Sequence, residues 1–304
     1  TFLAGCPAPP QPLARSGEGA RALQFETRHF RTADGLTLEG DVGGPEGAPM
    51  VVLMHGGGQT RHSWAGAMAA LVTAGYRVTN LDARGHGMSD WSPTRAYGLP
   101  DRINDVHAVV EGCGVPFALV GASMGGLTAI HAIGEGLSPA ALVLVDIVPQ
   151  MEPAGVDRIV GFMNANHGGF ASLEEAADAV AAYYPERPRP KDPSGLMKNL
   201  RQKEDGRLYW HWDPSMFNVE DPSNFHDPLA RSTDRLGQRP EVPVLVVRGR
   251  LSDIVSDESI AAFRAQVPHA GVHDIAGAGH MIAGDRNDAF NAAVIDFLQD
   301  VMPL

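Results

Sequence analysis

Short apolar runs recur along the chain and restrict its possible folds more than any other feature. The runs span 50–54, 76–82, 117–122, 141–148 and 242–249, with a weaker sixth at 271–277. Such runs, with little polar alternation, are typical of strands that are buried on both faces of a parallel sheet. Helical patterns lie between them, at about 63–74, 101–111, 124–135, 257–266 and 287–299. This alternation predicts a doubly wound α/β sheet with right-handed crossovers.

The first part of the chain follows a different pattern. Residues 1–22 are rich in Pro, Gly and Ala, and we expect them to be a leader or tail outside the core. Residues 24–42 alternate apolar and polar side chains around Asp34-Gly35. Because Asp-Gly is a favoured pair for a tight turn, this segment predicts an antiparallel hairpin.

More than ninety residues separate the strand that ends near 148 from the one that begins near 242. A structureless loop of that length is improbable in a compact domain. The segment contains two helical patterns, "SLEEAADAVAAYY" and "GLMKNLRQK". We therefore predict a helical cap over 149–240, inserted into a core formed by 23–148 and 241–304.

Charge and cysteine content exclude several classes of function. The net charge is −12, so a nucleic-acid partner would need a concentrated basic face, and no basic arm or stripe is present. No apolar run reaches the roughly 18–20 residues that span a bilayer. The two cysteines, Cys6 and Cys113, allow neither a disulfide framework nor a CxxC metal site. We expect no metal, no cofactor, no nucleic-acid partner and no membrane span.

The segment "FALVGASMGG" carries the strongest signal for chemistry. Gly121 to Gly125 fit the pattern G-x-S-x-G between a buried strand and a helix. A serine at such a sharp turn has a strained backbone, and its neighbours two positions away must be very small. The turn exposes the hydroxyl of Ser123 and directs the N–H of Met124 to the position of an oxyanion. Ser123 is therefore the candidate nucleophile, and Met124 is a candidate oxyanion donor.

A second glycine-rich segment, "HGGG" at 55–58, also follows a buried strand. Glycines there let the backbone approach a ligand and present its amides. We expect the N–H of Gly57 to complete the oxyanion hole, with Gly56 as a neighbouring contact to the substrate. The phosphate-binding patterns G-x-x-x-x-G-K-[ST] and G-x-G-x-x-G are absent at this place.

A nucleophilic serine needs a base, and the base needs a carboxylate that fixes its tautomer. His280 lies in the loop "GAGHM" before the last helix, and Asp253 follows the strand that ends near 249. We assign them as base and acid. Asp146, which ends the preceding strand, is the competing acid.

These motifs together resemble the α/β-hydrolase-fold serine hydrolases. The likeness extends from about residue 24 to 300 and includes "HGGG", "DARGHGMSD", "GASMGG", "RGRLSD" and "GAGHM" in the family's order. The resemblance implies a mostly parallel eight-stranded sheet flanked by helices, with an inserted helical cap. It also implies that Asp82, Arg84 and Ser89 support a loop wall rather than take part in catalysis.

The resemblance implies an esterase-like enzyme. We expect a carboxylesterase-like hydrolase that cleaves small to medium, fairly hydrophobic carboxylic esters through an acyl-enzyme intermediate. A lactonase or a C–C bond hydrolase on the same triad is an alternative. A small-molecule receptor with little turnover is an alternative of another class. Relatives that open epoxides or displace halide carry a carboxylate where this chain has Ser123, so both of those reactions are disfavoured.

Aromatic residues of the predicted cap are candidates for the substrate pocket. Tyr183, Trp210 and Trp212 could contact an acyl or aromatic substrate, or could form the core of the cap itself. Residues 186–207 hold seven Lys/Arg and four Asp/Glu, a net of +3. This charge could attract a carboxylate-bearing substrate, although a solvated helix face is the plainer explanation.

Location and assembly follow less directly from the sequence. We expect a cytoplasmic protein that could form a homodimer. "LAGC" at 3–6 resembles the lipobox of bacterial lipoproteins, so a lipoprotein or exported form remains an alternative.

Overall fold

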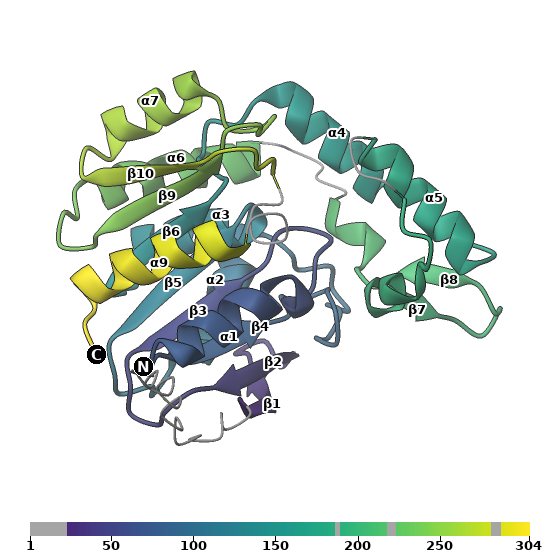
Figure 1. The fold of residues 1–304 in the computed structure, drawn as a ribbon, viewed down its shortest axis with the longest axis horizontal. Helices are drawn as coiled ribbons and strands as arrows, with labels where there is room; N and C mark the ends of the chain where they lie inside the picture. Colours follow the sequence, from purple (N-terminus) through teal and green to yellow (C-terminus); the bar gives the residue numbers. More distant parts are fainter. Residues whose placement is uncertain (1–22, 186–188, 218–222, 281–286) are drawn as a thin grey trace, which may run out of the picture.

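The structure is a computed structural model that describes residues 23–185, 189–217, 223–280 and 287–304. The expected leader, with Cys6 and "LAGC", lies outside the described residues. An eight-stranded sheet forms the centre, in the order β1-β2-β4-β3-β5-β6-β9-β10 (Figure 1). β1 and β2 pair antiparallel, β2 pairs antiparallel with β4, and the other neighbours pair parallel. This mostly parallel sheet confirms the predicted fold class.

The strands lie close to their predicted positions. Their bounds are β1 (Phe25–Arg31), β2 (Thr37–Gly43), β3 (Met50–Met54), β4 (Arg77–Leu81), β5 (Phe117–Ala122), β6 (Ala141–Val145), β9 (Val244–Gly249) and β10 (Ala270–Ile275). The hairpin of β1 and β2 turns at Asp34-Gly35, where Gly35 has a φ of +88°. Such a φ favours glycine.

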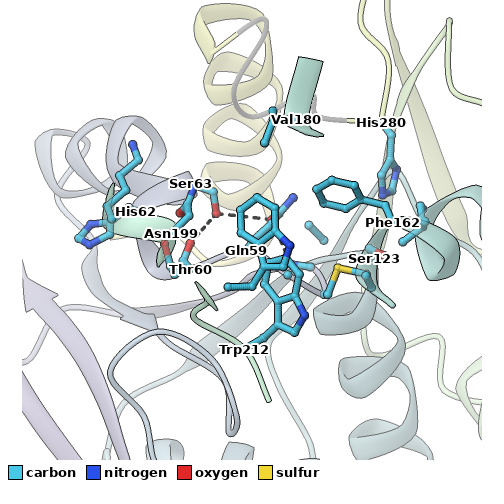
Figure 2. A pocket seen from close by; sticks show the side chains of 18 of the residues that line it. Gln59, Thr60, His62, Ser63, Ser123, Phe162, Val180, Asn199, Trp212 and His280 are labelled. Atoms are coloured by element: carbon cyan, nitrogen blue, oxygen red, sulfur yellow. Dashed lines mark hydrogen bonds between the residues drawn. The ribbon is translucent and has the colours of Figure 1, made fainter. Parts of the chain in front are cut away.

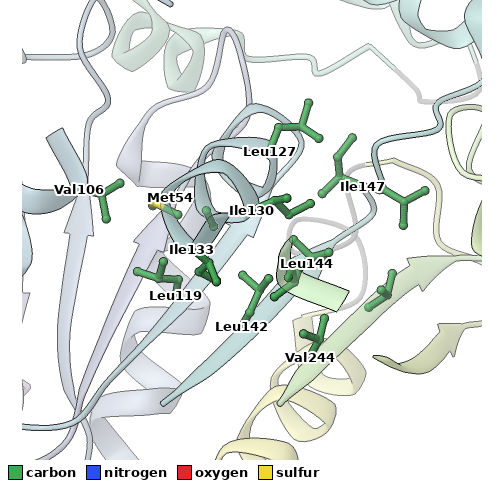
Figure 3. Close-up of a cluster of buried hydrophobic side chains, with 14 of the residues drawn as sticks. Met54, Val106, Leu119, Leu127, Ile130, Ile133, Leu142, Leu144, Ile147 and Val244 are labelled. Atoms are coloured by element: carbon green, nitrogen blue, oxygen red, sulfur yellow. The ribbon is translucent and has the colours of Figure 1, made fainter. Parts of the chain in front are cut away.

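Helices cover both faces of the sheet. The helices α1 (Ala65–Thr73), which follows the short η1 (Arg61–Trp64), and α9 (Asn287–Val301) pack on one face. The helices α2 (Leu99–Val110), α3 (Met124–Gly134), α6 (Ser223–Gly237) and α7 (Asp257–Gln266) pack on the other. In β3, Val51 and Leu53 pack on the face covered by α1 and α9, whereas Val52 and Met54 pack on the other face. Figure 3 shows Met54 within the cluster on this second face. Burial on both faces explains why the apolar runs show little alternation.

The segment between β6 and β9 extends away from the sheet as a cap (Figure 1). It contains α4 (Pro153–Met163), α5 (Leu173–Tyr183), η2 (Ser194–Asn199), β7 (Leu200–Gln202), β8 (Leu208–Trp210) and η3 (Pro214–Phe217). The prediction of a helix at "GLMKNLRQK" is wrong in its second half, because β7 pairs there with β8. The hydrogen bonds between β7 and β8 override the local helical pattern. Sequence periodicity does not detect this pairing.

The helix α6 was not predicted, and it packs against α3 of the core although it lies in the range expected for the cap. A Cβ at Gly134 would collide with Ser232 of α6, and Nδ1 of His131 lies 2.7 Å from Oγ of Ser232. The part that projects from the sheet therefore ends before α6. Within the described residues, no helix is long and apolar enough to cross a bilayer.

Candidate active site

Ser123 occupies the sharp turn between β5 and α3. Its backbone has a φ of 45° and a ψ of −114°, a conformation that costs energy for any residue with a side chain. A Cβ at Gly121 would lie 2.5 Å from backbone atoms of Gly125 and Gly126. A Cβ at Gly125 would collide with the backbone of Met54 in the adjacent strand β3. The two glycines of the motif are therefore required by backbone contacts, as the sequence predicted.

His280 and Asp146 lie together near this turn. Nδ1 of His280 donates a hydrogen bond to Oδ2 of Asp146 at 2.8 Å. The Asp146 side chain is fully buried, at the end of β6, and it also accepts bonds from Ser252 Oγ at 2.6 Å and Gly249 N–H at 3.0 Å. These bonds fix the carboxylate and leave Nε2 of the imidazole as the basic atom. Ser123 and His280 line the same end of one cavity (Figure 2).

The structure does not place Asp253 beside His280, which corrects the assignment made from sequence. The Asp253 carboxylate is 40% exposed and forms an ion pair with Arg158 of α4 at 2.6 Å. A Cβ at Gly155 of α4 would collide with the backbone of Asp253, so the cap packs tightly on this loop. Asp253 thus contacts the cap, and Asp146 holds the imidazole.

Two backbone amides are available for an oxyanion. Met124 is the first residue of α3, so its N–H has no acceptor within the helix. In the loop after β3, the N–H of Gly56 donates to Oε1 of Gln59 and that of Gly58 donates to Nε2 of His86. Among the described residues, the N–H of Gly57 has no such acceptor. A Cβ at Gly56 would lie 3.2 Å from Cβ of Ser123, so this loop runs beside Ser123.

Two buried histidines form hydrogen bonds with the backbone of Gly58, one with its N–H and the other with its carbonyl. His86 Nε2 accepts from the N–H of Gly58 at 3.1 Å, while its Nδ1 donates to the carbonyl of Arg84 at 3.1 Å. His211, from the cap, donates through Nε2 to the carbonyl of Gly58 at 3.2 Å and accepts at Nδ1 from the N–H of Gly87 at 2.8 Å. Gly58 has a φ of +72°, which glycine adopts without strain. The cap thus reaches the loop that carries the candidate oxyanion donor.

A third histidine supports the start of the same loop. His55 donates through Nδ1 to the carbonyl of Gly56 at 2.8 Å and accepts at Nε2 from the N–H of Ala83 at 3.0 Å. Each of the three rings therefore donates with one nitrogen and accepts with the other, which requires the neutral form. The ring centroids lie 5.0 Å apart for His55 and His86, and 5.8 Å apart for His86 and His211.

Burial keeps these imidazoles uncharged. Desolvation lowers the pKa of His55, although Asp82 opposes the shift. Desolvation, with repulsion from its two histidine neighbours, lowers the pKa of His86 well below the ordinary value. Desolvation lowers the pKa of His211 to about 3. These shifts favour the neutral form of all three rings, in which each ring can both donate to and accept from the backbone.

The turn "DARGHGMSD" supports the wall of the site, as expected. The buried Asp82 binds Arg61 and accepts from the N–H of Met88 at 3.0 Å, and Ser89 Oγ donates to the carbonyl of Asp82 at 2.6 Å. Arg84 is fully buried and pairs with Asp105 at 2.6 Å.

A cavity of about 480 Å³ opens between the cap and the core. Gly56, Tyr183, Trp210 and Trp212, all predicted substrate contacts, line it. Trp210 and Trp212 stack with centroids 4.9 Å apart, and Phe162 stacks on Tyr183 at 4.3 Å. These rings form a largely apolar wall that extends from Ser123 and His280, so they serve both the cavity and the small core of the cap.

Sequence reasoning missed two residues of this region. One is His211, whose bonds to Gly87 and Gly58 join segments distant in the chain and leave no signature in the local sequence. The other is Lys198 of η2, which lines the cavity. The sequence shows only the net positive charge of 186–207 and does not single out this lysine. Among the described residues, no cluster of three or more His, Cys, Asp or Glu side chains is arranged to hold a metal ion.

Comparison with known proteins identifies the family of this chain. The sequence profile of the Alpha/beta hydrolase family matches residues 51–293. Esterase Rv0045c of Mycobacterium tuberculosis is 30% identical over 250 residues, 79% of each chain. A 3-hydroxybutyrate-oligomer hydrolase of Cupriavidus necator is 28% identical over 255 residues, 78% of this chain and 84% of that protein. A crystal structure of the Mycobacterium tuberculosis esterase superposes with a TM-score of 0.71 at 25% identity, covering 94% of each chain. The chain belongs to the alpha/beta hydrolase family.

Proposed function

We propose that this protein is a carboxylesterase-like serine hydrolase that uses Ser123, His280 and Asp146. One observation supports this most directly. A serine in a strained strand-to-helix turn shares a cavity with an imidazole whose other nitrogen is bonded to a buried carboxylate. Such an arrangement activates a hydroxyl as a nucleophile, and it is recognised by geometry rather than by sequence position.

The steps follow from the positions of these groups. Ser123 Oγ attacks the ester carbonyl while Nε2 of His280 takes its proton, and Asp146 stabilises the imidazolium. The N–H groups of Met124 and Gly57 bind the oxyanion of the tetrahedral intermediate. His280 then protonates the leaving alcohol, which leaves an acyl-enzyme on Ser123. A water molecule, deprotonated by His280, hydrolyses it.

The size and lining of the cavity support the proposal that the substrates are small to medium esters with an apolar body. Its aromatic walls favour an acyl or aromatic group, and a volume of about 480 Å³ is in the range of small-molecule sites. The related proteins named above are described as an esterase and as a hydrolase of hydroxybutyrate oligomers, which are esters.

The direct test is turnover of 4-nitrophenyl butyrate by the purified protein and by Ser123→Ala. We expect the variant to lose about 10³-fold or more in kcat while its circular dichroism and unfolding midpoint match wild type. A fluorophosphonate should form one covalent adduct per molecule of wild type and none with Ser123→Ala, as measured by mass spectrometry. Ser194→Ala, an exposed serine of the cap, serves as the matched control. Labelling or near-normal turnover of Ser123→Ala would contradict the assignment of the nucleophile. Hydrolysis of lactones or dienoate ketones in place of esters would instead show that the protein is a lactonase or a C–C bond hydrolase.

A further inference from the structure

The cavity has an unusual charge for this protein. The chain carries 36 acidic and 24 basic side chains, yet none of the described residues that line the cavity is Asp or Glu. Lys198 is the one Lys or Arg among those lining residues. Among the described lining residues, one side chain therefore carries a full positive charge and none carries a negative charge.

Polar and apolar groups are separated along the cavity. Figure 2 shows Ser123 and His280 at one end, and His62, Ser63 and Asn199 toward the opposite side, with rings such as Trp212 and Phe162 between them. Lys198 precedes Asn199 in η2, so its backbone belongs to the polar end. A substrate that reaches both ends would place an ester at Ser123, an apolar stretch along the rings and a polar terminus near η2.

Lys198 differs from the arginines of the cap in its contacts. Arg158 pairs with Asp253, Arg189 pairs with Asp178, Arg201 bonds to the carbonyl of Gly87, and Arg207 bonds to the carbonyls of Gly168 and Gly169. For Lys198, no ion pair or hydrogen bond to another described residue is formed, and its side chain is exposed. An anion that binds its exposed ammonium therefore displaces no ion pair with another described residue.

We propose that the substrate is an ester whose far end carries a carboxylate, and that Lys198 binds this carboxylate with help from Asn199 and His62. The proposal rests on the esterase function above and names its substrate class. An ammonium point charge attracts a carboxylate without demanding one geometry, and the amide of Asn199 can donate a hydrogen bond to the same group. Because this end is polar and partly open, the carboxylate keeps part of its hydration, so binding avoids the large cost of a buried charge.

The test compares esters that differ only in the terminal charge. Monomethyl suberate carries one carboxylate on the acyl arm, and dimethyl suberate replaces it with a neutral ester. Acid release in a pH-stat at pH 7.5 gives kcat/KM for each, after correction for the two ester groups of the diester. Sodium 6-acetoxyhexanoate and its methyl ester repeat the comparison with the carboxylate on the alcohol arm. We expect wild type to prefer the anionic member of at least one pair by about three- to tenfold, mostly through KM.

Variants then assign the preference to one side chain. Lys198→Gln should reduce the ratio of anionic to neutral kcat/KM to about 1, and Lys198→Glu should bring it below 1. The matched control is Lys203→Gln, because Lys203 lies in the same cap but stacks on Tyr209 and does not line the cavity. Lys203→Gln should keep the wild-type ratio. Adding 0.5 M NaCl should lower the wild-type ratio, since salt screens an exposed ion pair.

Two results would overturn the proposal: equal kcat/KM for both members of both pairs in wild type, or a preference that survives in Lys198→Glu. Failure of the esterase assignment looks different. In that case, neither the neutral esters nor 4-nitrophenyl butyrate would be hydrolysed, whereas failure of the carboxylate proposal leaves neutral ester hydrolysis intact.

Discussion

Nδ1 of His280 lies 2.8 Å from Oδ2 of Asp146, although 134 residues separate the two in the chain. Asp146 directly follows β6 and has a φ of 48°, and its carboxylate also accepts hydrogen bonds from Gly249 N–H and Ser252 Oγ. The acid of the proposed triad therefore follows β6, and the loop after β9 contributes bonds that orient this acid. Asp253, in that loop, instead connects to α4.

The two aspartates should differ sharply in their effect on activity. Asp146→Asn is expected to lower kcat for 4-nitrophenyl butyrate by about 10³–10⁴-fold, because the amide no longer stabilises the imidazolium and favours the wrong tautomer. Asp253→Asn loses a half-exposed ion pair to Arg158, so kcat should stay within about fivefold of wild type. Steady-state kinetics on both variants decides the assignment. The reverse order of effects would restore Asp253 as the acid.

Loss of the His211 ring should affect turnover more than binding. His211→Ala removes the bond that fixes the carbonyl of Gly58, next to the proposed oxyanion donor Gly57. We expect kcat to fall about tenfold with KM nearly unchanged, which is less than the ~10²–10³ cost of removing an oxyanion donor. His167→Ala, an exposed histidine of the cap, is the control and should match wild type. A rise in KM alone would instead indicate that His211 acts on the substrate pocket.

Neutral buried histidines should make the fold sensitive to acid. The pKa of His211 is about 3 in the folded protein, against about 6.5 in an unfolded chain. Below pH ~6.5 the unfolded chain binds a proton that the folded protein refuses, so stability is fully present above this pH and is lost as the pH falls toward 3. For this one residue the loss between pH 7.5 and 5.5 is on the order of 1 kcal/mol.

Urea unfolding at these two pH values measures the effect. Over this interval, the free energy of unfolding of His211→Gln should fall by about 1 kcal/mol less than that of wild type, because glutamine does not titrate. His167→Gln should show the wild-type dependence. If His211→Gln has the same pH dependence as wild type, the folded imidazole titrates normally and the inference of a neutral His211 is wrong.

The glycines of the nucleophile turn should be irreplaceable, unlike a glycine in the cap. Gly125→Ala places a Cβ against the backbone of Met54 and should lower the free energy of unfolding by about 1–3 kcal/mol or more. Gly161→Ala in α4 is the matched control, because no atom lies within 4 Å of its added Cβ. It should be neutral or stabilising by about 0.5–1 kcal/mol, as expected for alanine in a helix. Equal unfolding free energies for the two variants would show that the turn has room for a side chain.

The strands of the large sheet and the place of Ser123 between a buried strand and a helix could be predicted from the sequence. These features depend on local physics: apolar runs become strands buried on both faces, and Gly121 and Gly125 are required by backbone contacts around one sharp turn. The hairpin at Asp34-Gly35 is equally local, because the turn type follows from the residues in it.

Three features could be seen only in the folded protein: which aspartate binds His280, where the cap contacts the loop after β3, and which predicted helix is partly a strand. Asp146 and Asp253 both follow the ends of neighbouring parallel strands, and no sequence pattern states which carboxylate turns toward the loop of His280. His211 reaches Gly58 across 153 residues, and β7 exists because β8 lies beside it. Such contacts join segments that are distant in the chain. They contribute to stability only after the fold has brought those segments together, so local sequence patterns do not reveal them.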